Sequence, residues 1–398
     1  MDWRRHHAVI LGSDDWGMGA WAPDVSAYQR YSSHPFMQNT WSKGTLERPE
    51  DMRRLFSLLS SFHGADGRPA LFQPNYVVAL PDYEAIKEDG FTRYYDIGLA
   101  GPLPSRWQRG DILGTAREGM EMGVWYPQYH ARAHHFSPKR WVSLLKDGNR
   151  DVNELFEDQM YVWESTRERV KEYSYMTPLE MVQWVAKGIS YFQEAFGRRP
   201  QTVVNADVLP GVKEAWAANG FRVANIFRKV GFYYDPLTAL SYSSNNTLLD
   251  LILIEREHRL EYLDKACEDA ASAWERNEPA VVVTHRTNYV SFDPEDVAIN
   301  LGYLEEFLAR ICEKGAVFLT EVEALSLQLT GISAIAWPGE IVVRNYSDED
   351  RMVKLDLTED QIQWVKELRT DKEPSWELHD RTIVLSTNAH HEYVVAVK

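Results

Sequence analysis

The sequence predicts an α/β fold with parallel strands, followed by a small antiparallel β module. Short apolar runs typical of buried strands alternate with segments of helical spacing over most of the chain. Polar clusters come directly after several of these runs, as at the C-terminal ends of parallel strands. Beyond about Gly331 the helical patterns stop and strand-like runs separated by polar turns follow. We therefore divide the chain into a main domain, residues 1–330, and a β-rich accessory module, residues 331–398.

The individual elements follow from periodicity and from start and stop signals. One helix is expected to begin at Thr177, because Pro178 and Glu180 complete a capping box, and to end at Gly197. Strands of the main domain are expected at residues 7–11, within 69–80, and at 122–126, 202–204, 222–227, 280–284 and 316–319. The other helices are expected at residues 49–62, 111–119, 138–146, 153–172, 209–219, 260–275, 294–314 and 321–329.

Composition limits the partners of this chain. Its 398 residues are 44% hydrophobic and carry a formal net charge of -16. A uniformly acidic chain does not attract nucleic-acid phosphates, so we expect no nucleic-acid partner. No segment approaches the roughly 20 apolar residues of a membrane span, and no signal peptide is visible. We expect no membrane insertion, a cytoplasmic location, and two unpaired thiols at Cys267 and Cys312.

Two adjacent carboxylates, Asp14 and Asp15, follow the first apolar run, Val9-Ile10-Leu11. One of them could bind a metal while the other stays free as a base. Like charges this close raise one pKa unless a cation is present. The alternative is a turn or helix-cap pair, which the flanking Gly12-Ser13 and Trp16-Gly17 also allow.

Histidines gather in the segment Gln128-Tyr129-His130-Ala131-Arg132-Ala133-His134-His135. Divalent metals of the zinc type favour neutral imidazoles with a carboxylate and a position open to water. The segment follows an expected strand and precedes Ser137-Pro138, which places it in a strand-end loop. His130 and His134 are therefore candidate ligands, His135 is a possible substitute for either, and structural histidines are the alternative.

Other strand ends carry further candidates. His285 follows the strongly apolar strand at 280–284 and could act as a general acid. Asn288 and Tyr289 come next and suit substrate binding or shaping of the loop. Asp207 follows the strand at 202–204 and could bind substrate or cap a helix, while Asn75 is a weaker substrate-binding candidate.

The order of these motifs resembles the polysaccharide deacetylase family, the nodulation-factor deacetylase homology domain, over about residues 5 to 330. The chain is similar to a divergent bacterial branch of it. The resemblance implies a distorted (β/α)7-8 barrel. It also implies that Asp15, His130 and His134 hold a divalent metal, zinc above all, that Asp14 is the catalytic base, and that His285 protonates the leaving group.

The chain departs from the family in its third motif, where the family has an Arg that orients the catalytic Asp. Here that strand ends in Asn205-Ala206-Asp207. Arg132, in the histidine loop, is a candidate for supplying the charge or binding substrate instead. Trp16 also stands where the family has Gly, and the segment between the two metal motifs is long.

Three functions follow from these observations. The first is a metal-dependent hydrolase that removes N- or O-acetyl groups from a carbohydrate with metal-activated water. The second is a glycoside hydrolase that uses Asp14 with Asp207. The third is an inactive carbohydrate-binding protein, indicated by the missing Arg and by 14 Trp and 20 Tyr, whose rings can stack on sugars or fill the core. The accessory module could pack on the barrel, bind glycan or mediate a homo-oligomer.

Overall fold

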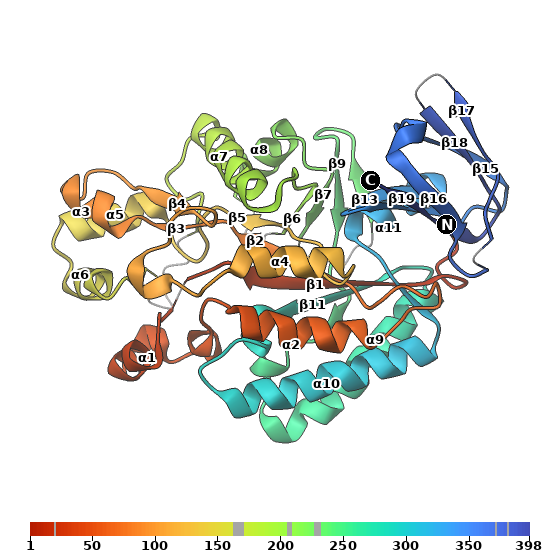
Figure 1. The fold of residues 1–398 in the computed structure, drawn as a ribbon. Coiled ribbons are helices and arrows are strands. Elements are labelled where there is room, and N and C mark those ends of the chain that lie inside the picture. Colours follow the sequence, from red (N-terminus) through yellow and green to blue (C-terminus); the bar gives the residue numbers. More distant parts are fainter. Residues whose placement is uncertain (20, 162–170, 205–208, 227–231, 371, 380–381) are drawn as a thin grey trace.

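A mostly parallel sheet with helices on both sides forms the body of the molecule (Figure 1). The structure is a computed structural model that describes residues 1–398 apart from 20, 162–170, 205–208, 227–231, 371 and 380–381. Figure 1 shows α2, α9 and α10 on one side of the sheet and α7 and α8 on the other, with the C-terminal strands at one end. The predicted α/β class is confirmed.

The central sheet has ten strands in the order β10–β11–β1–β2–β5–β6–β7–β9–β8, and β12 pairs with β1. Only the pairing of β8 with β9 is antiparallel. Within the described residues no pairing joins the edge strands β10 and β8, so the barrel is open there. The strands are β1 (His7–Trp16), β2 (Phe72–Val77), β5 (Gln128–Ala131), β6 (Thr202–Val204), β7 (Val223–Asn225), β8 (Tyr233–Asp235), β9 (Leu240–Ser243), β10 (Thr247–Leu248), β11 (Ala280–His285) and β12 (Ala316–Phe318). A separate antiparallel pair is formed by β3 (Ala79–Pro81) and β4 (Asp96–Gly98).

Helix α7 begins and ends where its capping residues predict. Thr177 and Glu180 form the expected capping box of α7, and Gly197 ends that helix at φ 68°. The α-helices are α1 (Val25–Tyr31), α2 (Pro49–Ser60), α3 (Tyr83–Glu88), α4 (Ile112–Glu121), α5 (Pro138–Lys146), α6 (Arg150–Glu157), α7 (Pro178–Phe196), α8 (Val212–Ala218), α9 (Arg259–Glu275), α10 (Pro294–Glu313) and α11 (Glu321–Thr330). Short 3-10 helices are η1 (Pro35–Met37), η2 (Thr40–Lys43), η3 (Ser105–Trp107), η4 (Leu251–Leu253), η5 (Arg256–His258), η6 (Arg286–Asn288) and η7 (Glu359–Gln361).

Two predicted elements are corrected by the structure. The strand expected at 122–126 begins later, at Gln128, and the earlier stretch contributes only an isolated bridge between Phe72 and Trp125. Pro127 has no N–H to donate, so the ladder with β2 starts after it. The helix expected at 153–172 ends at Glu157, and residues 162–170 lie outside the described part of the chain.

The first strand is buried on both faces, as expected of a parallel strand between two layers. Val9 and Leu11 belong to the large hydrophobic cluster of the main domain. Ala8 and Ile10, which point the opposite way, pack with residues of β12 and α11. Such two-sided packing fixes the position of the strand end, where the acidic pair lies.

The C-terminal strands form two antiparallel sheets, as predicted. One has the order β13–β14–β19–β16 and the other β15–β18–β17. Their bounds are β13 (Ile332–Trp337), β14 (Glu340–Asn345), β15 (Arg351–Leu355), β16 (Ile362–Glu367), β17 (Trp376–His379), β18 (Thr382–Thr387) and β19 (His391–Val397). Arg344 joins them to the main domain, because its buried guanidinium pairs with Glu323 and with Asp66, the latter at 2.8 Å. The domain boundary at residue 330 stays a prediction.

No helix in the described parts of the chain is long and apolar enough to cross a membrane. Cys267 and Cys312 are both free thiols, as expected.

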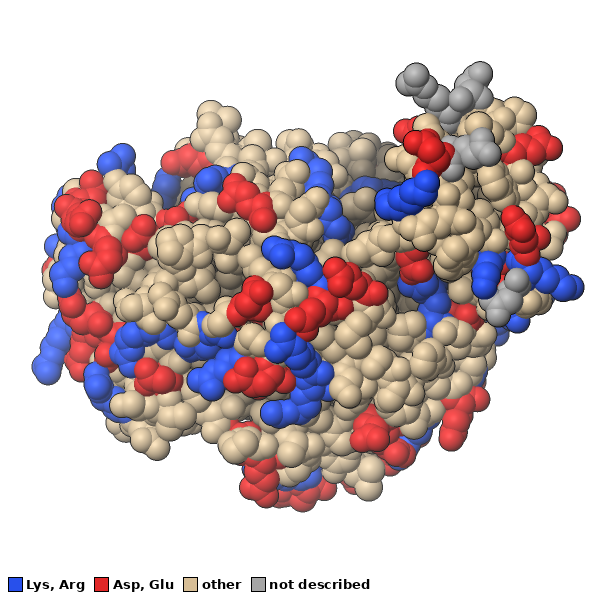
Figure 2. Space-filling model, in the orientation of Figure 1, with Lys and Arg blue, Asp and Glu red and all other residues tan. Residues whose placement is uncertain are grey.

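On the face shown in Figure 2, acidic and basic side chains are interspersed over most elements.

Candidate active site

The end of β1 brings two consecutive carboxylates to one place. Asp14 and Asp15 are both only 3% exposed. Consecutive strand residues normally point to opposite faces, but the pairing of β1 with β2 is irregular between Ser13 and Trp16. Asp15 has a φ of 70°, a left-handed conformation that is uncommon outside glycine. This irregularity turns both carboxylates toward the histidines of neighbouring strand ends.

Asp15 lies against both predicted histidine ligands. Its Oδ1 is 3.3 Å from His130 Nε2 and 3.6 Å from His134 Nε2. The candidate ligand atoms of the three residues all lie within 4.8 Å of one another. His130 lies on β5 itself rather than in the loop where we expected it, and His134 follows the strand. The structure thus brings the predicted ligand triad together.

Hydrogen bonding prepares His130 to bind a cation. Its Nδ1 is 2.7 Å from the carbonyl oxygen of Val204 on β6, so Nδ1 carries the proton. A neutral imidazole then presents a lone pair at Nε2, the atom that faces Asp15. A backbone carbonyl in this role is the usual support of a histidine ligand.

The triad fits a divalent cation of the zinc type. Asp15 Oδ1 is buried and has no hydrogen-bond donor among the described residues, so this acceptor has room for an electrophile. Burial raises the pKa of Asp15, but the imidazoles of His130 and His134 outweigh it and hold that pKa well below its usual range. Burial, with the neighbouring His135 and His130, lowers the pKa of His134 well below its usual value. Burial lowers the pKa of His130, but Asp15 and Asp14 outweigh it and raise that pKa, so a bound cation would take the place of the proton on His130 Nε2. An ionised carboxylate and neutral imidazoles are the forms that bind metal.

His135 was the predicted substitute ligand, and the structure favours His134. The His134 and His135 rings lie with centroids 4.0 Å apart, but it is His134 Nε2 that reaches Asp15. His135 has a φ of 65° and lies near Trp21, with 6.2 Å between ring centroids.

Asp14 lies outside the triad. Its Oδ1 accepts a hydrogen bond of 2.7 Å from Asn75 Nδ2, and its Oδ2 is 4.0 Å from His285 Nε2. Burial raises the pKa of Asp14, and the nearby His130 and His285 offset part of this effect. Asn75 is 1% exposed and its amide nitrogen holds Asp14, while its predicted binding of substrate stays a prediction.

His285 is the last residue of β11 and stands opposite Asp14 in the strand register. Its Nδ1 is 2.9 Å from both carboxylate oxygens of Asp250. Burial lowers the pKa of His285, but Asp250, with Asp15 and Asp14, outweighs this and raises it to about 10. Asp250 was missed in the sequence. Its signal was its place directly after Leu248-Leu249, the apolar pair at the end of β10, which follows the rule that identified the other candidates.

Asn288 and Tyr289 shape the loop after β11. Asn288 Nδ2 donates to Asp250 Oδ1 at 3.1 Å and to Thr284 Oγ1 at 3.1 Å, and its Oδ1 accepts from Ile252 N at 2.8 Å. The hydroxyl of Tyr289 is 2.9 Å from Thr284 Oγ1. Both side chains are buried and support Asp250 and β11, which agrees with the loop-shaping alternative, and their binding of substrate stays a prediction.

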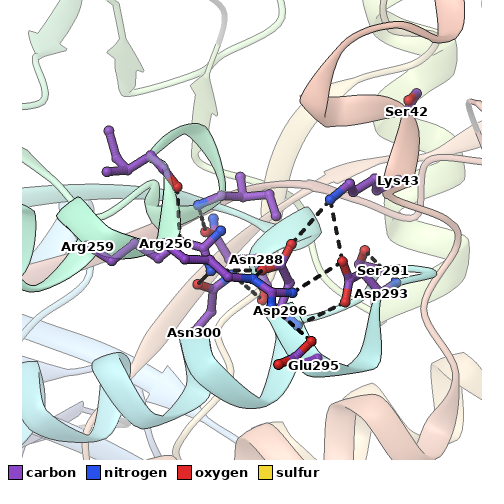
Figure 3. A network of polar contacts seen from close by, with 12 residues as sticks. Ser42, Lys43, Arg256, Arg259, Asn288, Ser291, Asp293, Glu295, Asp296 and Asn300 are labelled. Atoms are coloured by element: carbon purple, nitrogen blue, oxygen red, sulfur yellow. Dashed lines mark hydrogen bonds and ion pairs between the residues drawn. The ribbon is translucent and has the colours of Figure 1, made fainter.

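A charged network supports this loop from outside (Figure 3). Asn300 Nδ2 donates to the carbonyl oxygen of Asn288 at 3.2 Å. Arg259 Nη1 donates to Asn300 Oδ1 at 3.1 Å and to Asp296 Oδ1 at 3.0 Å. Lys43 Nζ donates to Asp296 Oδ2 at 3.3 Å. The network therefore links η2, which contains Lys43, to the loop that carries Asn288.

Of two further candidates, Arg132 does not join the site and Asp207 is not placed. The guanidinium of Arg132 makes a bidentate pair with Asp96, at 2.6 and 2.9 Å, and lies 3.8 Å over the ring of Trp184. It is therefore directed to β4 and α7 rather than to Asp14, where Asn75 supplies the donor. Asp207 lies outside the described residues, so its predicted role has no structural account.

Solved structures with similar folds include deacetylases. The Puue allantoinase is 10% identical, with 82% of this chain and 92% of that chain covered and a TM-score of 0.47. A probable polysaccharide deacetylase from Pseudomonas aeruginosa PAO1 is 11% identical, with 82% and 92% covered and a TM-score of 0.46. The Xyl-CE4 domain of a multidomain xylanase from the hindgut metagenome of Trinervitermes trinervoides is 9% identical, with 82% and 93% covered and a TM-score of 0.37. No family model and no curated protein matches the chain.

Proposed function

We propose that this protein is a metal-dependent hydrolase that removes N- or O-acetyl groups from a carbohydrate. The observation that carries the proposal is the convergence of Asp15, His130 and His134 beside two further titratable groups, Asp14 and His285. A base and an acid on either side of a cation site are the groups that hydrolysis of an acyl bond requires.

Each group has a separate role in the proposed reaction. Asp15, His130 and His134 would hold the cation, which when bound supplies Lewis acidity toward a carbonyl and toward water. Asp14 Oδ2 accepts the proton of the water that attacks the acyl carbon, since Asn75 already holds Oδ1. The bond from the acyl carbon to the leaving oxygen or nitrogen then breaks, and His285 Nε2 donates a proton to that leaving atom.

The pKa of His285 supports the role of acid. A pKa raised to about 10 keeps its imidazole protonated at neutral pH, with Nδ1–H directed to Asp250 and Nε2–H toward the site. Asp250 would also stabilise the charge before the proton is donated, much as a carboxylate orients a catalytic imidazole elsewhere. The raised pKa of Asp14 suits a base, because a carboxylate closer to neutrality accepts protons more readily.

An aromatic side chain at the site supports a sugar substrate. The half-buried Trp41 of η2 lies with its ring centroid 4.5 Å from that of His285. Trp21, near His135, is 8% exposed and belongs to the hydrophobic core, so Trp41 carries this argument. A flat apolar ring beside the acid matches the apolar face of a pyranose ring.

The test combines metal content with acetate release from a panel of N- and O-acetylated oligosaccharides. Zinc is measured by mass spectrometry after dialysis against zinc, for wild type and for the variants Asp15→Ala, His130→Ala and Asp14→Asn. We expect one zinc per wild-type chain, loss of zinc in the first two variants, and retained zinc without acetate release in Asp14→Asn. Stoichiometric zinc in both Asp15→Ala and His130→Ala would overturn the site assignment. Glycan binding without turnover under any divalent metal would support the inactive carbohydrate-binding protein instead.

A further inference from the structure

A short loop joins the two histidines of the candidate metal centre. His130 lies in β5, the strand ends at Ala131, and Arg132 and Ala133 lead to His134. The distance between the two imidazoles therefore depends on the backbone path through Arg132 and Ala133.

One carboxylate oxygen holds this path. The peptide N–H groups of Arg132 and Ala133 both donate to Glu172 Oε1, at 3.0 and 2.9 Å. Trp184 Nε1 on α7 donates to the same oxygen at 2.6 Å. Glu172 is 4% exposed, so these bonds form away from bulk solvent, where hydrogen bonds to a charged acceptor are strong.

The side chain of Arg132 is fixed separately from its peptide group. Its guanidinium pairs with Asp96 at 2.6 Å and lies over Trp184, whose indole N–H binds Glu172. The loop is therefore held at its backbone by Glu172 and at its side chain by β4 and α7. Glu172 does not touch the candidate ligand atoms, and any influence on the site passes through the two peptide groups.

We propose that Glu172 is a positioning residue for the metal centre: by binding the two peptide N–H groups between His130 and His134, it sets the spacing of the two imidazoles around the cation. This inference rests on the proposed metal centre. Partners outside the ligand set commonly orient ligands, and their loss typically lowers metal affinity by about 10- to 100-fold.

The test is the affinity for zinc, measured by competition with a chromophoric chelator. Burial raises the pKa of Glu172 to about 7, although the hydrogen bonds from Ala133, Trp184 and Arg132 oppose this rise. The measurement is therefore made at pH 8, where the carboxylate is mostly ionised. We expect the Kd for zinc to rise about tenfold or more in Glu172→Ala, and less in Glu172→Gln, whose amide oxygen still accepts hydrogen bonds. The absorption spectrum of the cobalt-loaded protein should change with it, because the ligand geometry changes.

Glu323→Gln is the matched control. Glu323 is a comparably buried carboxylate, at 2% exposure, that accepts from a peptide N–H and pairs with Arg344, but it supports the C-terminal sheets. We expect it to lower stability in urea without changing the Kd for zinc. Unfolding of each metal-free variant is followed by circular dichroism, and affinities are measured well below its transition, so Glu172→Gln carries the test if Glu172→Ala does not fold.

The outcomes separate the two proposals. A wild-type protein that binds zinc, with Glu172 variants of the same affinity and cobalt spectrum, would overturn the positioning role alone. The same loss of affinity in Glu323→Gln would overturn it too, because the effect would then follow general destabilisation. A wild-type protein that binds no zinc would overturn the metal centre and this inference with it.

Discussion

Asn75 Nδ2 donates a hydrogen bond of 2.7 Å to Asp14 Oδ1, and the two residues lie on the adjacent strands β2 and β1. The donor is a neutral amide, whereas the deacetylase motifs led us to expect an arginine that orients this carboxylate. It fixes the carboxylate without adding positive charge. Asp14 thus keeps the raised pKa that burial gives it.

Removing this amide should slow the reaction without removing the metal. In Asn75→Ala, a buried carboxylate oxygen loses its donor, at a cost of about 1–3 kcal/mol. If that cost falls on the transition state, kcat for acetate release drops about 5- to 150-fold. Zinc content should stay stoichiometric. A kcat within a factor of two of wild type would show that Asp14 needs no such support.

Replacing the base itself should have a larger effect. Asp14→Asn keeps the shape of the side chain but cannot accept the proton of water, so we expect kcat to fall by about a hundredfold or more. Steady-state kinetics and zinc analysis on the same preparation check this. A variant that loses both zinc and activity would place Asp14 among the ligands instead.

The ion pair of Asp250 and His285 should make stability depend on pH. The pKa of His285 in the folded protein, about 10, lies above its ordinary value of 6.5. The ion pair therefore contributes fully to the free energy of unfolding below pH 6.5, and this contribution is lost as pH rises through about 10. Asp250→Asn removes most of this contribution. At pH 6 the metal-free wild type should therefore have a higher free energy of unfolding in urea than metal-free Asp250→Asn. This difference should shrink by about 1 kcal/mol or more by pH 10. A gap that is constant with pH would contradict the raised pKa.

Chelation should lower thermal stability through the triad alone. A ligand at a hundred times its Kd stabilises the folded state by about 2.7 kcal/mol, so we expect zinc to raise the Tm of wild type by a few degrees and EDTA to reverse it. Differential scanning fluorimetry of wild type and His134→Ala checks this. An equal zinc-dependent shift in His134→Ala would mean that the cation binds elsewhere.

The contact between the main domain and the C-terminal sheets should depend strongly on the guanidinium of Arg344. Arg344→Met leaves Glu323 and Asp66 buried without their partner, and breaking such a pair costs about 3–5 kcal/mol. Urea denaturation measures this loss. Arg351→Met removes an exposed pair with Glu349 and serves as the control, with stability close to wild type.

Local patterns predicted the α/β class and several polar residues at strand ends, because the information lay close together in the chain. Asp14 and Asp15 directly follow an apolar run, and His285 directly ends another, so the strand-end rule found all three. The capping box at Thr177 likewise fixed the start of α7.

The remaining parts depend on contacts between distant segments. Arg132 binds Asp96, which lies 36 residues earlier in the separate pair of β3 and β4. No local pattern in the sequence links that pair of strands to the histidine loop. Asp250 can be identified as the partner of His285 only once the two-residue strand β10 is seen to pair with β11, which ends at His285. Glu172 lies in a stretch that helical periodicity assigned to a helix, whereas its function depends on the backbone of a loop some 40 residues away.

The left-handed backbone of Asp15 restricts how this centre could be changed by evolution or by engineering. Aspartate, asparagine and histidine enter that conformation several-fold more readily than most residues, and of these three aspartate alone brings a negative charge to the cation. A swap to glutamate or cysteine would change the ligand group and strain the chain at the same position. New metal preferences are therefore easier to reach through His130, whose backbone is not left-handed, than through the carboxylate that the β1 irregularity presents.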